Sequence, residues 1–349
     1  MSWFRRDTPS LSSFDLEGVV DIIKSGKAKN IITLAGAGIS TAAGIPDFRS
    51  SSSGIYDNLE EFNLPHPMAV FSLDYFKTNP KPFFEVARRL YRPHAKPTLT
   101  HYFVRLLHEK TLLRRHYTQN VDDLERLSGL SEDKFVEAHG TFHTGHCQQC
   151  HEEYTFEYMR DQIIRKEVPK CSANCNGVVK PDVVLFGENL PRKFYSRLSS
   201  VSFLLHCSAD HFTYYYCNLY DGFLQDFSAC DLLLIMGTSL QVLPFAGLIH
   251  RVGPRVPRLY LNREYSEDDQ TGFISFIMRF MVAGFRRHPL RWGRSDNTRD
   301  VFVRGDTDSS VLKLAELLGW EEELLNMKKT TDEELELLQS NLPTSDISS

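Results

Sequence analysis

The chain has 349 residues, of which 42% are hydrophobic and 24% charged, and its formal net charge is −5. This length accommodates one large domain or two smaller ones, and the composition is that of an ordinary globular protein. The charge gives no general attraction to nucleic acid, and no apolar run approaches the roughly 20 residues that cross a bilayer. We therefore expect neither direct nucleic-acid binding nor a membrane protein.

The first part of the chain combines strand and helix patterns. Residues 15–27 have the apolar spacing of an amphipathic helix, and residues 30–34 are a short apolar run that predicts a strand. Residues 55–92 contain four prolines and several aromatic stretches, which indicates a compact helical insert. Residues 100–110 return to helical spacing. The insert therefore interrupts a unit in which strands and helices alternate.

Further apolar runs predict strands that end near Thr118, Gly237 and Asn262. Strands that alternate with helices predict an α/β protein with a Rossmann-like, doubly wound parallel sheet. Ligands of such sheets bind at the carboxyl ends of the strands. The residues that follow the strands therefore form one candidate site, which comprises Gly36 to Arg49, Gln119 to Asp122, Gly237 to Ser239 and Asn262 to Glu264.

Three segments do not fit this alternation. Residues 201–225 are rich in aromatic side chains, and residues 273–294 are apolar and then basic. We interpret both as surface insertions, with a lid or a partner-binding segment as the alternative. Residues 328–349 start with helical character but end polar, and we expect this tail to be mainly disordered.

Four of the seven cysteines form two close pairs, Cys147 with Cys150 and Cys171 with Cys175. Two such pairs supply the four thiolates of a tetrahedral zinc site, whereas free thiols are the alternative. Because four protein ligands leave no position for a catalytic water, we expect one structural zinc ion. The nearby histidines are interpreted as surface residues. The odd number of cysteines and the absence of a secretory signal in the first ten residues favour a reducing compartment.

The stretch LAGAGISTAAGIPDFRS follows the first predicted strand. Gly36 and Gly38 match the start of a dinucleotide-binding fingerprint, but Gly44 comes six residues after Gly38 instead of three. By itself the turn is either a loose nucleotide site or an ordinary strand-to-helix connection. The DFR that follows adds a carboxylate and a guanidinium, which suit a ribose or amide group and a phosphate, or form a local salt bridge.

His139 follows another apolar stretch and comes shortly before the cysteine pairs. A single histidine is more often structural, but a position at a domain junction makes it a candidate general base. Gln119, Asn120 and Asp122 follow a predicted strand, where amides and carboxylates suit either a helix cap or a ligand.

In their order along the chain, several motifs closely resemble the sirtuins, the NAD-dependent protein lysine deacylases. These motifs are GAGISTAAGIPDFRS, YTQNVDDLERLSG, EAHGTF, the two cysteine pairs, VVKPDVVLFGENLP, MGTSLQV and LNRE. The resemblance extends from about residue 14 to residue 327, apart from the two insertions. GIYDNLEEFNLPHP, YFKTNPKPFF and LAELLGW are most similar to the class I branch of cytosolic tubulin and histone deacetylases.

The resemblance implies a large NAD-binding domain and a smaller domain built from the helical insert and the zinc module. NAD and the acyl-lysine peptide would meet in the cleft between them. The expected units are an N-terminal tail at 1–13, the Rossmann-like domain at 14–53, 101–139, 182–200 and 226–327, the helical module at 54–100, the zinc-binding module at 140–181, the insertion at 201–225 and the tail at 328–349.

The resemblance also implies site residues by motif match. NAD would contact Gly36, Ala37, Gly38, Ile39, Ser40, Thr41, Asp47, Phe48, Arg49, Gln119, Asn120, Val121, Asp122, Gly237, Thr238, Ser239, Asn262, Arg263, Glu264 and Thr307. The backbone of Val184, Leu185, Phe186, Gly187 and Glu188 would pair with the extended peptide. The four paired cysteines would hold the zinc ion, and His139 would be the catalytic residue.

In the mechanism that the resemblance implies, His139 acts as general base on the ribose hydroxyls. The acyl group passes from lysine to ADP-ribose, and nicotinamide is released. No arginine lies between Ser50 and Lys77, where relatives that remove acidic acyl groups have one, so a neutral acyl chain is expected. The branch resemblance implies acyl-lysine proteins such as histones or tubulin as substrates, in the cytoplasm with possible entry to the nucleus.

The chain departs from the family pattern at a few positions. Val121 and Leu185 replace the usual isoleucine and phenylalanine, which should adjust packing more than chemistry. Thr307 stands where relatives often have a cysteine near the adenine. Residues 201–225 have no family counterpart, so they are either a real insertion or a gene-prediction artefact. Two other functions stay open from sequence: transfer of ADP-ribose to a protein side chain, and a catalytically silent zinc-containing scaffold.

Overall fold

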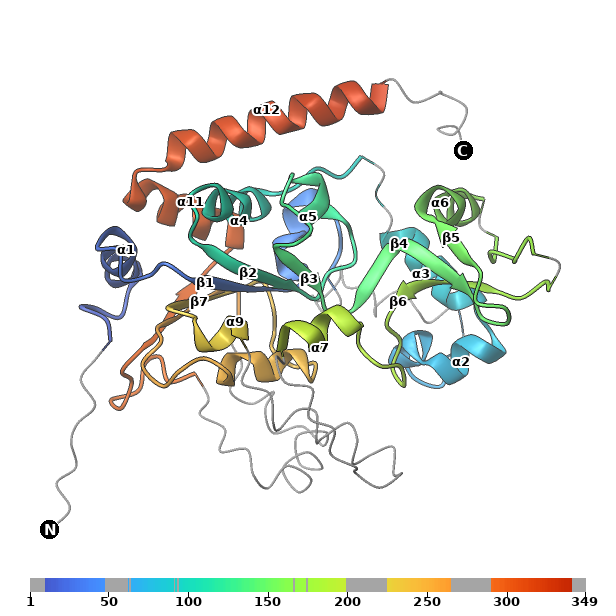
Figure 1. Ribbon diagram of the computed structural model, residues 1–349, viewed down its shortest axis with the longest axis horizontal. Helices are drawn as coiled ribbons and strands as arrows, with labels where there is room; N and C mark the ends of the chain where they lie inside the picture. Colours follow the sequence, from blue (N-terminus) through green and yellow to red (C-terminus); the bar gives the residue numbers. More distant parts are fainter. Residues whose placement is uncertain are drawn as a thin grey trace, which may run out of the picture.

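A computed structural model gives the fold of the chain (Figure 1). It describes residues 10–47, 62, 64–90, 92, 94–165, 167–173, 175–198, 225–264 and 290–340. Two expectations fall largely outside these ranges: the insertion at 201–225, of which only Gln225 is described, and the segment 273–294, described from residue 290. Among the described helices, none is both long and apolar enough to cross a membrane.

A six-stranded parallel sheet forms the centre of the larger part of the molecule. Its strands lie in the order β3-β2-β1-β7-β8-β9. They are β1 (Ile31–Ala35), β2 (Leu113–Thr118), β3 (Phe135–Glu137), β7 (Leu232–Met236), β8 (Arg258–Asn262) and β9 (Asp300–Arg304). The crossover between β1 and β7, with β2 on the other side of β1, makes the sheet doubly wound. The predicted fold class is confirmed.

The sheet strands are apolar on both faces because helices cover both. Alternate residues of β7 point to opposite sides: Leu232 and Leu234 pack into one core, and Leu233 and Ile235 into the other. The first core is closed by α1 (Leu16–Lys24), α4 (Leu99–Glu109) and α11 (Thr307–Leu318). The second is closed by α7 (Arg192–Leu198), α9 (Gln225–Ser228) and the 3-10 helix η6 (Phe245–His250).

A smaller part stands beside the edge strand β3 of this sheet (Figure 1). It contains the antiparallel strands β4 (Gly140–Cys147), β5 (Glu153–Thr155) and β6 (Val179–Val183), in the order β5-β4-β6. Its helices are η5 (Pro67–Phe71), α2 (Leu73–Thr78), α3 (Lys81–Leu90) and α6 (Phe156–Ile164). Phe76, Phe83 and Phe84 pack with Ile163 and Val183 in one core. The helical insert and the cysteine-bearing sheet therefore form one packed unit.

The expected disorder of the C-terminal tail is wrong for residues 328–340. These residues belong to α12 (Glu321–Ser340), which lies across α11 and α4 (Figure 1). The Tyr102 hydroxyl donates to Asp332 at 2.8 Å, and Arg105 donates to Thr331 at 3.0 Å. Polar contacts thus fix a helix whose composition resembles that of a tail. Residues 341–349 lie outside the described part of the chain.

The two chain ends that flank the insertion lie close together. Helix α7 before it and α9 after it are neighbours. Phe194 of α7 and Phe227 of α9 both pack on Tyr117, with ring centroids 6.4 and 5.3 Å away. Asp226 is buried and accepts hydrogen bonds from Arg115 and Tyr117. The fold on either side of the insertion is therefore anchored in the core independently of it.

Candidate active site and metal centre

The glycine turn after β1 touches the turn after β7. The Gly38 amide donates to the Gly237 carbonyl at 2.8 Å. A Cβ on Gly38 would lie 2.7 Å from the Gly237 Cα, and one on Gly36 would lie 2.7 Å from the Thr238 Cβ. Both glycines are therefore required by contact between two strand ends. Gly44 has φ +79° and ends the 3-10 turn Thr41–Ala43, so it is needed for its conformation.

Three strand ends bring polar side chains together at this edge of the sheet. Ser40 follows β1, and its hydroxyl donates to the Asp122 carboxylate at 2.6 Å. The Asn120 amide donates to the Ser40 Oγ at 3.1 Å. The Thr238 hydroxyl donates to the Gln119 Oε1 at 2.6 Å, which joins β2 to β7. Residues predicted from separate stretches of sequence are thus assembled into one network, as expected for carboxyl ends of parallel strands.

Asp122 lies in a buried group of acids and imidazoles. Burial and the charge of Glu125 raise the pKa of Asp122. Burial also acts on Glu125, but its hydrogen bond with His116 holds the pKa of Glu125 below the ordinary value. A ring nitrogen of His101 and carboxylate oxygens of both acids lie within 4.8 Å of one another. With the pKa of Asp122 raised and that of Glu125 lowered, Asp122 takes up a proton at a higher pH than Glu125 does.

His139 lies between β3 and β4, where the large sheet passes into the small one. Its ring centroid is 6.2 Å from that of Phe245. Burial lowers the pKa of His139 to about 4, and a hydrogen bond to the backbone of Gln119 opposes this only in part. The imidazole is therefore neutral at pH 7 and can accept a proton. Gly140 follows with φ +78°, and a Cβ there would lie 1.9 Å from the Asp182 carbonyl oxygen.

The strand ends of β8 and β9 complete the opposite half of the candidate site. The Asn262 side chain donates to the Tyr260 hydroxyl at 2.9 Å, and that hydroxyl donates to the Thr238 carbonyl at 2.6 Å. The exposed Arg263 pairs with Asp306 at 2.5 Å. The Thr307 hydroxyl lies 3.5 Å from the Gly38 carbonyl. Sequence reasoning missed Tyr260 and Asp306.

The segment expected to bind the peptide connects both parts of the molecule. The Val184 amide donates to the His139 carbonyl at 2.8 Å. Phe186 bridges to the helical insert, since its amide donates to the Phe71 carbonyl and its carbonyl accepts from the Leu73 amide. The Leu185 amide donates to the Glu188 carboxylate, and the Glu188 amide to the Leu185 carbonyl. At most one of the five amides, that of Gly187, is left for a peptide.

The four paired cysteines converge as predicted. Their Sγ atoms are 3.4 to 3.5 Å apart for the pairs Cys147–Cys175, Cys150–Cys171 and Cys150–Cys175. Tetrahedral zinc with bonds near 2.3 Å places its sulfurs about 3.8 Å apart, so the set fits the ion. Backbone amides of Gln149, Ala173 and Gly177 donate to three of the sulfurs, which suits thiolates. The donor set and its closed geometry fit a structural zinc ion.

Two of the nearby histidines, His143 and His146, have partners outside the cysteine cluster. His143 stacks on Phe156 and pairs with Asp123 at 3.5 Å. His146 pairs with Asp182 at 2.7 Å. Their interpretation as residues outside the metal set agrees with the cluster of four cysteines found among the described residues.

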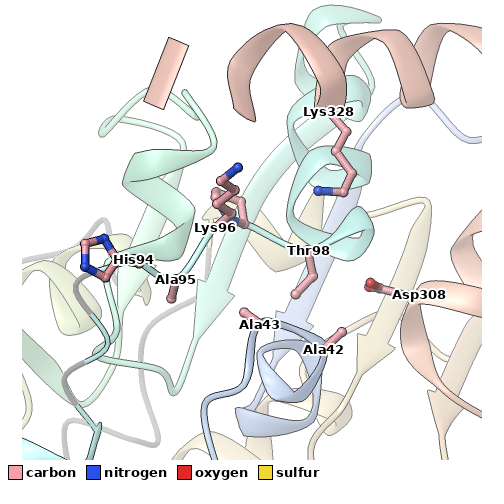
Figure 2. A pocket seen from close by; sticks show the side chains of 9 residues that line it. Ala42, Ala43, His94, Ala95, Lys96, Thr98, Asp308 and Lys328 are labelled. Carbon is pink, nitrogen blue, oxygen red and sulfur yellow. The ribbon is translucent and has the colours of Figure 1, made fainter. Parts of the chain in front are cut away.

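Two of the predicted loop residues, Phe48 and Arg49, lie outside the described part of the chain, and Asp47 is the last residue before it. A cavity of about 280 Å³ lies between Ala42 and Ala43, which follow the glycine turn, and Lys328 (Figure 2). Lys328 reaches into it from α12, opposite Ala42 and Ala43. Its lining comprises Ala42, Ala43, His94, Ala95, Lys96, Pro97, Thr98, Asp308 and Lys328, of which only Ala42 and Ala43 lie in a predicted candidate stretch, Gly36 to Arg49.

Comparison with known proteins identifies the relatives of this chain. The pattern of the Sir2 family matches residues 36–206. The chain is 46% identical to the NAD-dependent protein deacetylase sirtuin-2 of Danio rerio, over 91% of this chain and 76% of that protein. It is 41% identical to the NAD-dependent protein deacetylase hst2 of Schizosaccharomyces pombe, over 93% and 82%. Identity to sirtuin-3 of Mus musculus is 42%, over 91% and 80%.

Proposed function

Because this chain belongs to the Sir2 family and is an NAD-dependent protein deacylase, we propose that it removes neutral acyl groups from protein lysines with His139 as general base. The observation that carries the assignment is the position of His139. Its imidazole is half-buried, the pKa of the ring is lowered, and the His139 carbonyl accepts a hydrogen bond from Val184 at the start of the segment Val184–Glu188. A base in this position is ready to accept a proton near a bound peptide.

When bound, NAD supplies the ribose carbon that accepts the acyl oxygen and the nicotinamide that leaves. The chain's own part is to bind and orient. The turn from Gly36 to Thr41 would hold the phosphates and ribose, and Asn120 with Asp122 would form the amide end of the pocket. Support comes from the Ser40, Asn120 and Asp122 network, whose side chains already hold one another in fixed directions. His139 would take the proton from a ribose hydroxyl.

The peptide would lie along Val184–Glu188. Since four of the five amides donate within the chain, the segment offers mainly carbonyl acceptors, of which those of Leu185 and Phe186 already accept one hydrogen bond each, and the peptide would contribute most of the N–H donors. Histones and tubulin are the substrates proposed from the branch resemblance. The same resemblance leads us to propose a cytoplasmic enzyme with access to the nucleus.

The test replaces His139 by Asn and His143 by Asn as a matched control. His143 is 46% exposed and is not a predicted site residue. We expect His139→Asn to lower peptide-dependent nicotinamide release by about 10²- to 10⁴-fold, the usual contribution of a general base. Zinc content and melting temperature should match those of the control. Equal activity of the two variants would contradict the role of His139.

A second arm identifies the reaction product. Mass spectrometry of an acetyl-lysine peptide after incubation with NAD should show loss of the acetyl group. A peptide or protein that gains ADP-ribose instead would favour the transferase alternative. NAD consumption without a deacylated peptide would contradict the proposed reaction.

A further inference from the structure

A lysine ammonium is buried directly beneath the proposed peptide segment. Lys180 lies in β6 and is only 6% exposed. Its Nζ donates to the Pro181 carbonyl at 2.9 Å and to the Val183 carbonyl at 2.8 Å, and it lies 3.1 Å from the Glu188 carboxylate. Lysines are almost never buried without such compensation. Three oxygens around one ammonium therefore link strand β6 to the turn that follows it. We call these contacts of Lys180 with Pro181, Val183 and Glu188 the Lys180 joint.

Glu188 extends this joint into the segment itself. Its carboxylate pairs with Lys180 and also accepts the Leu185 amide at 2.8 Å, while the Glu188 amide donates to the Leu185 carbonyl. The turn at Gly187, with φ +100°, is thus closed by two hydrogen bonds and one ion pair. The ion pair fixes the carboxylate, and the carboxylate fixes the direction of the Leu185 peptide group.

The residues between these contacts are fixed at both ends by other elements. Val184 is hydrogen-bonded to the His139 carbonyl, and the backbone of Phe186 is hydrogen-bonded to that of Phe71 and Leu73. A change in the conformation of the segment would therefore reach both the proposed general base and the helical insert. The Lys180 joint links the segment to strand β6 of the small sheet.

We propose that Lys180 is a positioning residue for the acyl-lysine peptide, acting through Glu188 to hold Val184 to Gly187 in the conformation that presents acceptors to the substrate strand. The proposal rests on the proposed function, in which this segment binds the peptide. Within the described part of the chain, the polar partners of the Lys180 ammonium are Pro181, Val183 and Glu188, none of which is a predicted NAD-binding residue. Its effect should consequently fall on the peptide and spare the cofactor.

The experiment compares Lys180→Met with Lys180→Arg and Asp182→Asn. Methionine keeps the length of the side chain but removes the ammonium that donates to the Pro181 and Val183 carbonyls and pairs with the Glu188 carboxylate. We expect KM for an acetyl-lysine peptide to rise about tenfold or more, as for a lost hydrogen bond to a charged group, with KM for NAD changed less than about twofold. Lys180→Arg should recover part of the loss.

Asp182→Asn controls for general damage to β6. The Asp182 carboxylate accepts hydrogen bonds from Thr144 and His146 of the paired strand β4. This variant should leave both KM values near those of the wild type. Melting temperature and zinc content of all variants report whether the fold survives. If Lys180→Met is too unstable to assay, Glu188→Gln tests the same joint, since it removes the charge but keeps an acceptor for Leu185.

Two outcomes separate failure of the joint from failure of the peptide site. In the wild type, a saturating acetyl-lysine peptide should slow hydrogen exchange across residues 184–188. Absence of this protection would overturn the proposed peptide site itself. Protection in the wild type together with parallel changes in both KM values, or with no change, in Lys180→Met would overturn the positioning role alone.

Discussion

The contact between two glycine turns makes Gly38→Ala a sharp test of the candidate site. Gly38 lies outside the left-handed region of φ, so alanine meets no conformational penalty there. The added Cβ would nevertheless lie 2.7 Å from the Gly237 Cα and 2.8 Å from its carbonyl oxygen. Both are backbone atoms that cannot rotate away. The two turns must therefore separate by about 0.7 Å or more to restore an ordinary contact of about 3.4 Å.

The size of the effect follows from this overlap. Overpacking by one methyl group costs about 1–3 kcal/mol, and the lower entropy of the unfolded chain returns at most about 1 kcal/mol. The net cost is then about 0–2 kcal/mol, and at roughly 2–4 °C per kcal/mol for a domain of this size the melting temperature should fall by up to about 8 °C. If the turn holds the phosphates of NAD, KM for NAD should rise while KM for the peptide stays near its wild-type value.

The measurements are thermal unfolding and steady-state kinetics with each substrate varied in turn. Gly253→Ala is the matched control, because a Cβ there would meet only the Val256 Cγ2 at 3.5 Å, an ordinary contact. The reasoning would be refuted by a Gly38→Ala protein with the melting temperature and both KM values of Gly253→Ala. A fall in stability without any change in KM for NAD would refute only the role of this turn in cofactor binding.

Three further predictions concern the metal centre, the insertion and the buried histidine. Chelation of zinc, or Cys171→Ser, should unfold the small sheet and release about one zinc ion per chain, measured by a metallochromic dye; a chain without zinc would contradict the site. Deletion of residues 201–224 should leave the melting temperature near that of the wild type and activity within about twofold, because α7 and α9 are anchored separately. Burial lowers the pKa of His101 to about 4. Between about pH 6.5 and pH 4 the unfolded state therefore binds more protons than the folded state. The free energy of unfolding should fall by up to about 3 kcal/mol as pH falls through this range. His101→Gln should flatten that dependence in urea titrations at each pH.

Much of the fold could be predicted from sequence because its strands are buried on both faces. Leu232–Met236 is a continuous apolar run for this reason, and the polar residues that follow such runs had to meet at one sheet edge. The four cysteines were equally predictable, since two closely spaced pairs of cysteines indicate a metal site with four sulfur ligands. These are local signals whose meaning does not depend on distant partners.

The missed features depend on partners far apart in the chain. The composition of α12 is polar, and its ordering comes from contacts such as that of Tyr102 with Asp332, 230 residues apart. Tyr260 reads as one more apolar residue of a strand, and only the position of Thr238 shows what its hydroxyl does. The acidic character of Glu125 gave no sign that His101 and His116 lie beside it. Tertiary proximity of this kind leaves no periodic trace in a sequence.

The place of His139 between two sheets gives the enzyme a mechanical sensitivity. Only two residues, Ala138 and His139, join strand β3 of the large sheet to strand β4 of the small one, and Gly140 passes so close to Asp182 that no side chain fits. Any rotation of the metal-bearing unit about this link turns the His139 backbone with it. We therefore expect damage to the distant cysteine cluster to displace the proposed general base before the large sheet loses its own packing.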